Sequence, residues 1–237
     1  MQMTTENLFK EEGDYLKKNP TWHVEDSAWK ADQVLKLIER NKLQPATIVE
    51  IGCGAGEVIS QLQQKMADKS IRFTGYEIAP DAFKLCLQRK KEGLDYFQGD
   101  LLQTNNFYDL LLMIDVFEHV EDYIGFIKKA GQKAGHKIYH IPLDMSVLSI
   151  LTNYPAAARK NVGHLHYFMK DTALATLQDA GQEVIDWFYT KGAFEVNNKK
   201  TTAGGWVINQ FRRFFYWIKP GLSVKMFGGF SLIVLTK

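Results

Sequence analysis

The sequence is poor in cysteine, in excess charge of one sign and in long apolar runs. Two cysteines in 237 residues cannot form a disulfide framework, which fits a reduced, cytoplasmic setting. A formal net charge of +2 indicates neither a nucleic-acid surface nor an acidic partner. No segment reaches the roughly 18 apolar residues of a membrane span, and none near the start resembles a signal peptide. We therefore expect a cytoplasmic globular protein with one substantial core.

The most informative stretch is Thr47–Val58, which reads TIVEIGCGAGEV. Its first five residues form a short β-branched run, which the glycines Gly52, Gly54 and Gly56 interrupt before apolar residues recur at helical spacing. Strand, glycine loop and helix predict the opening of a nucleotide-binding type of α/β domain, in which a large ligand lies against the backbone. The dinucleotide fingerprint is Gly-x-Gly-x-x-Gly, and here the third glycine comes one position early.

Acidic residues stand at the ends of successive predicted strands. Glu77 ends the apolar run of residues 71–76, 21 residues after Gly56, which is about the distance at which a ribose-binding acid follows such a loop. Four strand ends carry an acid each: Glu50, Glu77, Asp100 and Asp115. Ligands of open parallel sheets lie across the carboxyl ends of the strands, so we expect these carboxylates to converge on one crevice. Such a crevice suits a cationic ligand and would repel a pyrophosphate.

The motifs at residues 49–56, 75–78, 99–101 and 114–120 resemble, in this order, those of class I S-adenosylmethionine-dependent methyltransferases. The resemblance covers roughly residues 22–190 and a final strand. It implies a Rossmann-like α/β fold with seven strands in the order 3-2-1-4-5-7-6, the last strand antiparallel and helices on both faces. It also implies S-adenosyl-L-methionine as the cofactor and S-adenosyl-L-homocysteine as the product.

The resemblance assigns the cofactor to residues of these motifs. Glu77 would hold the ribose hydroxyls, Asp100 and Leu101 would flank adenine, and Asp115 with Val116 would face the methionine end and the substrate. The full set of expected cofactor-binding residues is Glu50, Gly52, Cys53, Gly54, Gly56, Glu77, Ile78, Asp100, Leu101, Asp115 and Val116.

Four parts are expected along the chain. Residues 1–43 form an N-terminal helical arm and lid, and residues 44–190 form the cofactor-binding core. Residues 191–228 are an insertion between strands six and seven, where a hairpin would need only a few residues. Residues 229–237 are the final strand of the core. A single helix is expected over residues 144–160.

Candidate substrate residues lie on either side of this core. Trp22 and His23 precede the first strand and could close over the cofactor, as N-terminal segments often do in the resembled family; packing against the sheet is the alternative. After strand five, His164 and Tyr167 are expected on the wall of the substrate pocket. His164 and His166 would suggest a metal pair if taken alone, but no nearby cysteine or third histidine completes a coordination shell, so no metal is expected.

Methyl transfer is a displacement at the methyl carbon, and alignment of the two partners supplies much of the rate. A hydroxyl acceptor also has to lose its proton, for which histidine is the usual base near neutral pH. His119, just beyond strand four, and His166 are the candidate catalytic residues. An amine acceptor would need no such base.

The insertion carries an apolar helical face over residues 206–219, beside positive charge at Arg212, Arg213 and Lys219. It could cover the pocket or pack on the core, form a homodimer contact, or make a peripheral contact with an anionic membrane. Its aromatic, weakly basic character favours a lipid-linked, aromatic or saccharide acceptor over nucleic acid.

The expected function is therefore methyl transfer from S-adenosylmethionine to a small-molecule acceptor, with a hydroxyl favoured. Three alternatives remain open at this point: a nucleotide-dependent oxidoreductase or epimerase, an aminopropyl transferase that uses the decarboxylated cofactor, and a non-catalytic scaffold that binds S-adenosylmethionine. Binding of a nicotinamide cofactor would indicate the first, and lack of activity with every acceptor the last.

Overall fold

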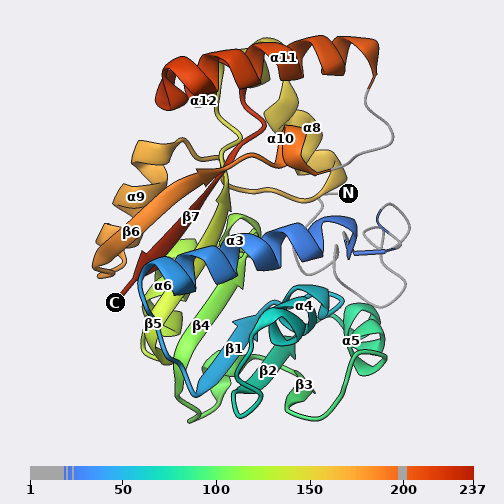
Figure 1. The fold of residues 1–237 in the computed structure, drawn as a ribbon, viewed down its shortest axis with the longest axis vertical. Coiled ribbons are helices and arrows are strands. Elements are labelled where there is room, and N and C mark those ends of the chain that lie inside the picture. Colours follow the sequence, from blue (N-terminus) through green and yellow to red (C-terminus); the bar gives the residue numbers. More distant parts are fainter. Residues whose placement is uncertain (1–18, 20, 23, 197–201) are drawn as a thin grey trace.

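The computed structural model describes residues 19, 21–22, 24–196 and 202–237 (Figure 1). His23, a candidate lid residue, lies outside this part of the chain, as do residues 1–18 of the expected N-terminal arm.

One mixed sheet forms the centre of the described chain (Figure 1). The strand order is β3-β2-β1-β4-β5-β7-β6, in which β7 runs antiparallel to both neighbours and the other pairs are parallel. The predicted order and the antiparallel last strand are confirmed. The strands are β1 (Thr47–Ile51), β2 (Arg72–Glu77), β3 (Leu94–Gln98), β4 (Tyr108–Ile114), β5 (Ala134–Pro142), β6 (Val184–Thr190) and β7 (Ser231–Thr236).

Helices cover both faces of this sheet because its central strands are apolar on both sides. In β4, Leu110 and Leu112 join the core on one face, where α3 and α4 pack, whereas Leu111 and Met113 join the core on the other face, where α6 and α9 pack. The α-helices of the described chain are α3 (Ser27–Arg40), α4 (Glu57–Lys65), α5 (Pro80–Leu87), α6 (Tyr123–Gly131), α7 (Val147–Leu151), α8 (Tyr154–Asn161), α9 (Lys170–Asp179), α10 (Gly192–Glu195), α11 (Ala203–Ile218) and α12 (Pro220–Phe227). Three short 3-10 helices are η1 (Val24–Asp26), η2 (Leu101–Gln103) and η3 (Phe117–His119).

The single helix expected over residues 144–160 is wrong, because the structure divides this segment into α7 and α8. Asn153, between them, has a φ of +54°, a left-handed conformation that ends an α-helix. The first helix begins only after Ser146, whose hydroxyl accepts a hydrogen bond from the Ser149 N–H at 3.1 Å. Asp144 therefore stays outside the helix, beside the end of β5.

The insertion between β6 and β7 contains α10, α11 and α12, and α11 lies across one end of the molecule (Figure 1). Arg212 attaches α11 to the chain that enters β7, because its guanidinium donates to the carbonyls of Gly228 and Phe227, both at 2.9 Å. Large apolar side chains elsewhere on α11, among them Trp206 and Trp217, are exposed. No helix in the described ranges is both long and apolar enough to cross a membrane.

Candidate active site

A cavity of about 1270 Å³ lies at the carboxyl ends of β1, β2 and β4. Glu50 and the glycine loop after β1, Glu77 at the end of β2 and Asp115 after β4 all line it, and α3 adds Lys30. Ligand pockets typically measure roughly 300–1,000 Å³. This cavity therefore has room for a cofactor and an acceptor together.

The glycine loop passes three times through the left-handed backbone region, with φ of +66° at Gly52, +56° at Gly54 and +75° at Gly56. A Cβ at Gly52 would stand 3.0 Å from a methyl group of Val116, so a larger residue would displace the Val116 side chain, which lines the cavity. The ring of Trp22 lies over Gly54, 3.9 Å from the place of a Cβ there. The loop backbone is therefore enclosed between two side chains that both line the cavity.

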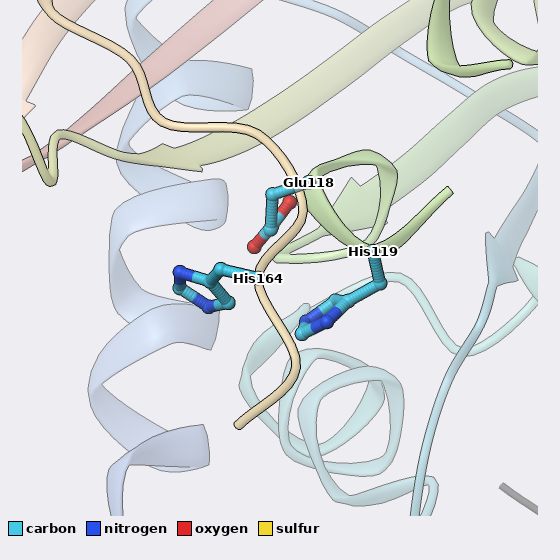
Figure 2. Close-up of side chains that lie close together, drawn as sticks. All are labelled: Glu118, His119 and His164. Carbon is cyan, nitrogen blue, oxygen red and sulfur yellow. The ribbon is translucent and has the colours of Figure 1, made fainter. Parts of the chain in front are cut away.

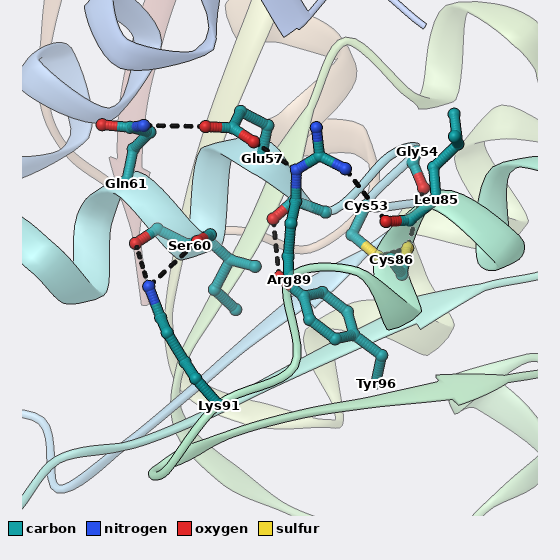
Figure 3. Close-up of polar contacts among 12 residues, drawn as sticks. Cys53, Gly54, Glu57, Ser60, Gln61, Leu85, Cys86, Arg89, Lys91 and Tyr96 are labelled. Carbon is teal, nitrogen blue, oxygen red and sulfur yellow. Dashed lines mark hydrogen bonds and ion pairs between the residues drawn. The ribbon is translucent and has the colours of Figure 1, made fainter. Parts of the chain in front are cut away.

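Side chains behind the loop hold it in this shape (Figure 3). The Tyr96 hydroxyl donates to the Gly56 carbonyl at 2.7 Å, and the Cys86 thiol donates to the Gly54 carbonyl at 3.0 Å. Cys53 is buried with its sulfur 3.8 Å from that of Cys86. In the free protein, Cys53 thus acts as a small buried residue of the loop.

Two buried carboxyl groups lie against the loop. Glu77 accepts hydrogen bonds from the N–H groups of Gly54 and Ala79, both at 2.7 Å, while burial raises its pKa. Glu50 accepts one from the Ile59 N–H at 3.2 Å, and burial raises the pKa of Glu50 to about 8. A cation placed in the cavity would favour the ionised form of both groups.

Asp115 forms a chain of polar contacts across the cavity wall. Its carboxylate pairs with Lys30 at 2.9 Å and with Nδ1 of His140 at 2.6 Å, and Nε2 of His140 lies 2.9 Å from the Thr190 hydroxyl. Burial opposes ionisation, but His140 and Lys30 outweigh it and hold the pKa of Asp115 well below its usual range. Asp115 also has a φ of +54°, and such backbone strain is common at functional sites.

Three side chains meet in the cavity wall beyond Asp115 (Figure 2). Glu118 and His119 belong to η3, and His164 belongs to the segment after α8; the ligand atom that each offers lies within 4.8 Å of the other two. Glu118 is fully buried, neither of its oxygens has a hydrogen-bond partner among the described residues, and burial raises its pKa well above the usual range. Asp144 lies 2.5 Å from Nδ1 of His164.

His166 and Tyr167 follow His164 in sequence, but neither lines the cavity. Nε2 of His166 lies 2.9 Å from the Val120 carbonyl, and its ring lies 4.2 Å from that of Tyr123, centre to centre. The Tyr167 hydroxyl donates to the His164 carbonyl at 3.0 Å. The geometry thus gives no support to His166 as a base or to Tyr167 as a substrate contact, whereas His164 and His119 line the cavity.

The adenine-binding residues expected after β3 also lie outside the cavity wall. Asp100 accepts a hydrogen bond from the Leu102 N–H at 2.8 Å and so begins η2, and Leu101 is fully buried. Their contact with adenine stays a prediction. Ile78, in contrast, lines the cavity with 63% of its surface exposed.

The residues of the site that the sequence analysis missed include Lys30, Glu118, His140, Asp144 and Tyr154. Asp144 follows β5 as the other acids follow their strands, so the same rule could have found it. Lys30 and Tyr154 carry no such signal, because only the tertiary positions of α3 and α8 bring them into the cavity wall.

Comparisons with known proteins agree with this geometry. The family model described as a methyltransferase domain matches residues 22–186. The chain resembles magnesium protoporphyrin IX methyltransferase from Synechocystis PCC 6803 with bound S-adenosylhomocysteine, at 15% identity and a TM-score of 0.58 over 93% of this chain and 85% of that one. It also resembles the N-methyltransferase NodS from Bradyrhizobium japonicum WM9 in complex with S-adenosylhomocysteine, at 16% identity and a TM-score of 0.56 over 98% and 95% of the two chains.

A third similar structure is a mycolic acid cyclopropane synthase, at 14% identity and a TM-score of 0.60 over 86% of this chain and 84% of that one. At such identities the likeness shows the fold alone. No curated protein matches the chain significantly. The family match covers more than half of the chain and includes the glycine loop, Glu77 and Asp115. The chain belongs to the methyltransferase domain family, as a class I S-adenosylmethionine-dependent methyltransferase.

Proposed function

We propose that this enzyme transfers the methyl group of S-adenosylmethionine to a hydroxyl oxygen of a small-molecule acceptor. The observation that carries the proposal is the group of Glu118, His119 and His164 in the cavity wall beyond Asp115. A hydroxyl must lose its proton as it attacks the methyl carbon, and carboxylate and imidazole groups are the usual means of removing one. An amine acceptor would not need such a group.

The cofactor side of the cavity supports this assignment. Surrounding carboxylates favour a sulfonium cation, and Glu77 stands at the strand end where a ribose-binding acid is expected. Trp22 would cover the ligand from the N-terminal side. Of the predicted cofactor-binding residues, these line the cavity: Glu50, Gly52, Cys53, Gly54, Glu77, Ile78, Asp115 and Val116.

Within the cluster, Asp144 orients His164. The contact between Asp144 and Nδ1 holds the imidazole in the tautomer with its proton on Nδ1, so Nε2 is the nitrogen that can accept a proton or a ligand. We therefore assign removal of the acceptor's proton to the cluster around His164, with His119 beside it, and no longer to His166.

The insertion between β6 and β7 supports a particular class of acceptor. The similar structures include a porphyrin methyltransferase and an N-methyltransferase, so the fold leaves the acceptor atom open. Exposed aromatic side chains on α11, including Trp206, Phe214 and Trp217, support an aromatic, lipid-linked or saccharide acceptor rather than nucleic acid. A peripheral membrane contact or a homodimer through residues 206–219 belongs to the same proposal, and vesicle sedimentation and light scattering would distinguish the two.

A reduced, cytoplasmic setting is also part of the proposal. It is supported by Cys53 and Cys86, which are free thiols buried inside the fold.

Steady-state assays with S-adenosylmethionine and a panel of hydroxyl and amine acceptors test the function, with release of S-adenosylhomocysteine as the signal. Hydroxyl acceptors should support turnover, and Glu118→Gln and His164→Ala should each lower kcat by about 100-fold, the size of a lost acid–base group. Affinity for S-adenosylhomocysteine should stay unchanged in both variants. His136→Ala, at the opposite end of β5, is the matched control. Turnover of amines alone would contradict the proposal.

A further inference from the structure

We propose that Glu118, His119 and His164 bind a divalent first-row transition cation in the wall of the cofactor cavity. Two segments far apart in sequence bring these residues together, namely η3 after β4 and the chain that follows α8 (Figure 2). The ligand atoms of the three residues lie within 4.8 Å of one another. Ligands at about 2.1 Å from a zinc ion in tetrahedral geometry lie about 3.4 Å apart, so small side-chain rotations would complete the site.

The burial of Glu118 is the first argument for a cation. The side chain is fully buried, and neither carboxylate oxygen has a hydrogen-bond partner within the described residues. A buried carboxyl group without partners is costly, and proteins usually compensate it by pairing or by metal coordination. Lys30, which also lines the cavity, forms its ion pairs with Asp26 and Asp115 instead.

The orientation of the histidines is the second argument. The carboxylate of Asp144 lies 2.5 Å from Nδ1 of His164, and the carbonyl of Gly163 lies 3.2 Å from Nδ1 of His119. Histidines that bind metals almost always donate the N–H of their second nitrogen to a carboxylate or a backbone carbonyl, which fixes the ring and the tautomer. Both kinds of partner are present here. Because each contacts Nδ1, the Nε2 atom of His164 and of His119 is left to bind the cation.

The donor set selects the class of cation. Two imidazoles and one carboxylate suit zinc, iron(II), cobalt(II) or manganese(II), whereas magnesium and calcium prefer oxygen donors. Three protein ligands leave a coordination position open, as in catalytic rather than structural zinc sites. Because all three residues line the cavity, the open position faces the space for the acceptor.

A cation here would explain how the cluster removes the acceptor's proton, and this step rests on the proposed function. A hydroxyl oxygen bound to a divalent cation loses its proton near neutral pH, because the cation stabilises the oxyanion. The resulting oxyanion attacks the methyl carbon, the carbon–sulfur bond breaks, and its electron pair stays on the neutral thioether. The proton passes to solvent.

Titration of the chelator-treated, full-length protein with cobalt(II) alone tests the site without any acceptor or methyl transfer. Cobalt(II) in a site with two imidazoles gives a visible absorption band, which should saturate at one equivalent per chain and disappear when zinc(II) is added. Glu118→Gln and His164→Ala should weaken cobalt binding at least about tenfold, and Asp144→Asn about tenfold, the usual effect of removing a partner behind a ligand. Glu39→Gln and His136→Ala are matched controls that should bind as the wild type does.

Two further measurements distinguish loss of the metal site from loss of the fold. Calorimetric binding of S-adenosylhomocysteine to each variant shows whether the cavity is intact. X-ray absorption spectroscopy of the zinc-loaded wild type should show two imidazoles bound to the zinc ion, and this readout needs no variant. A missing cobalt band, equal cobalt binding in wild type and intact variants, or zinc without imidazole ligands would overturn the proposal. Methyl transfer to hydroxyls that persists in chelator would overturn only the catalytic role of the cation.

Discussion

At the scale of single residues, the charged neighbours of each carboxyl group in the cavity decide whether its pKa is lowered or raised. Glu50 is buried and Asp115 is partly buried, and of the two only Asp115 forms ion pairs with Lys30 and His140. The pKa of Asp115 therefore lies below its usual range, whereas burial raises the pKa of Glu50 to about 8. The site combines a negative charge near the predicted methyl-donor end with carboxyl groups whose pKa is raised and whose ionised form a bound cation would favour.

Glu50 makes the stability of the free enzyme depend on pH in a defined direction. Its pKa is about 8 in the folded state and lies near the ordinary 4.5 in the unfolded state. Between these values the folded state binds more protons, so the contribution of Glu50 is fully present below about pH 4.5 and is lost as the pH rises through 8. Glu50→Gln, which stays uncharged, should therefore gain in melting temperature relative to the wild type as the pH rises across this window. Glu39→Gln, an exposed control, should keep a constant offset, and a constant offset for Glu50→Gln would contradict the assignment.

Sequence periodicity was sufficient to place residues at the ends of the strands, but it did not identify the side chains that contact them. Of the four acids expected to converge there, Glu50, Glu77 and Asp115 line the cavity and Asp100 does not. The three converge because the carboxyl ends of parallel strands meet at one edge. The partners come from elements that are remote in sequence: Lys30 from α3 reaches Asp115, and His164 reaches Glu118. No local pattern encodes such contacts, since they depend on how the helices pack after the sheet has formed.

At the scale of elements, the strands were easier to predict than the segments that cover the cavity. β4 ends directly before Asp115, as expected, and its five buried apolar residues, 110–114, occur without interruption. The helix expected over residues 144–160 is broken at Asn153, where a left-handed residue redirects the chain, and Asp144 is left beside His164. Pro155, in the first turn of α8, is a local signal for such a break, because proline is tolerated in the first turn of a helix and not in its interior.

The attachment of α11 depends on one arginine of a neighbouring pair. Arg212 donates to the carbonyls of Phe227 and Gly228 at the end of α12, whereas Arg213 donates to the Phe194 carbonyl from an exposed position. Arg212→Met should lower the free energy of unfolding by about 2 kcal/mol, since hydrogen bonds from a charged donor are lost and the carbonyls remain. Arg213→Met, the matched control, should change it by less than about 0.5 kcal/mol. Urea unfolding measures both, and equal effects would show that α11 is not held in this way.

At the scale of the whole molecule, the cavity connects parts of the chain that would otherwise be independent. Its wall includes Trp22 before η1, Lys30 on α3, the glycine loop and Gly192 at the start of the insertion. A ligand that contacts all of them binds the folded state and not the unfolded chain. Cofactor binding should therefore stabilise the entire fold, by an amount set by ligand concentration and affinity.

S-adenosylhomocysteine at 100 times its dissociation constant should stabilise the wild type by about 2.7 kcal/mol. For a chain of this length that corresponds to a rise of about 5–10 °C in melting temperature. Glu77→Ala removes the carboxylate expected on the ribose, and a tenfold loss of affinity would reduce the stabilisation at the same ligand concentration to about 1.4 kcal/mol. Because Glu77 also accepts hydrogen bonds from Gly54 and Ala79, the variant will melt lower even without ligand, so the comparison is between ligand-induced shifts. The control Glu92→Ala should show the same ligand-induced shift in melting temperature as the wild type, and NAD should produce no shift in any of these proteins. An undiminished shift in Glu77→Ala would place the ribose elsewhere in the cavity.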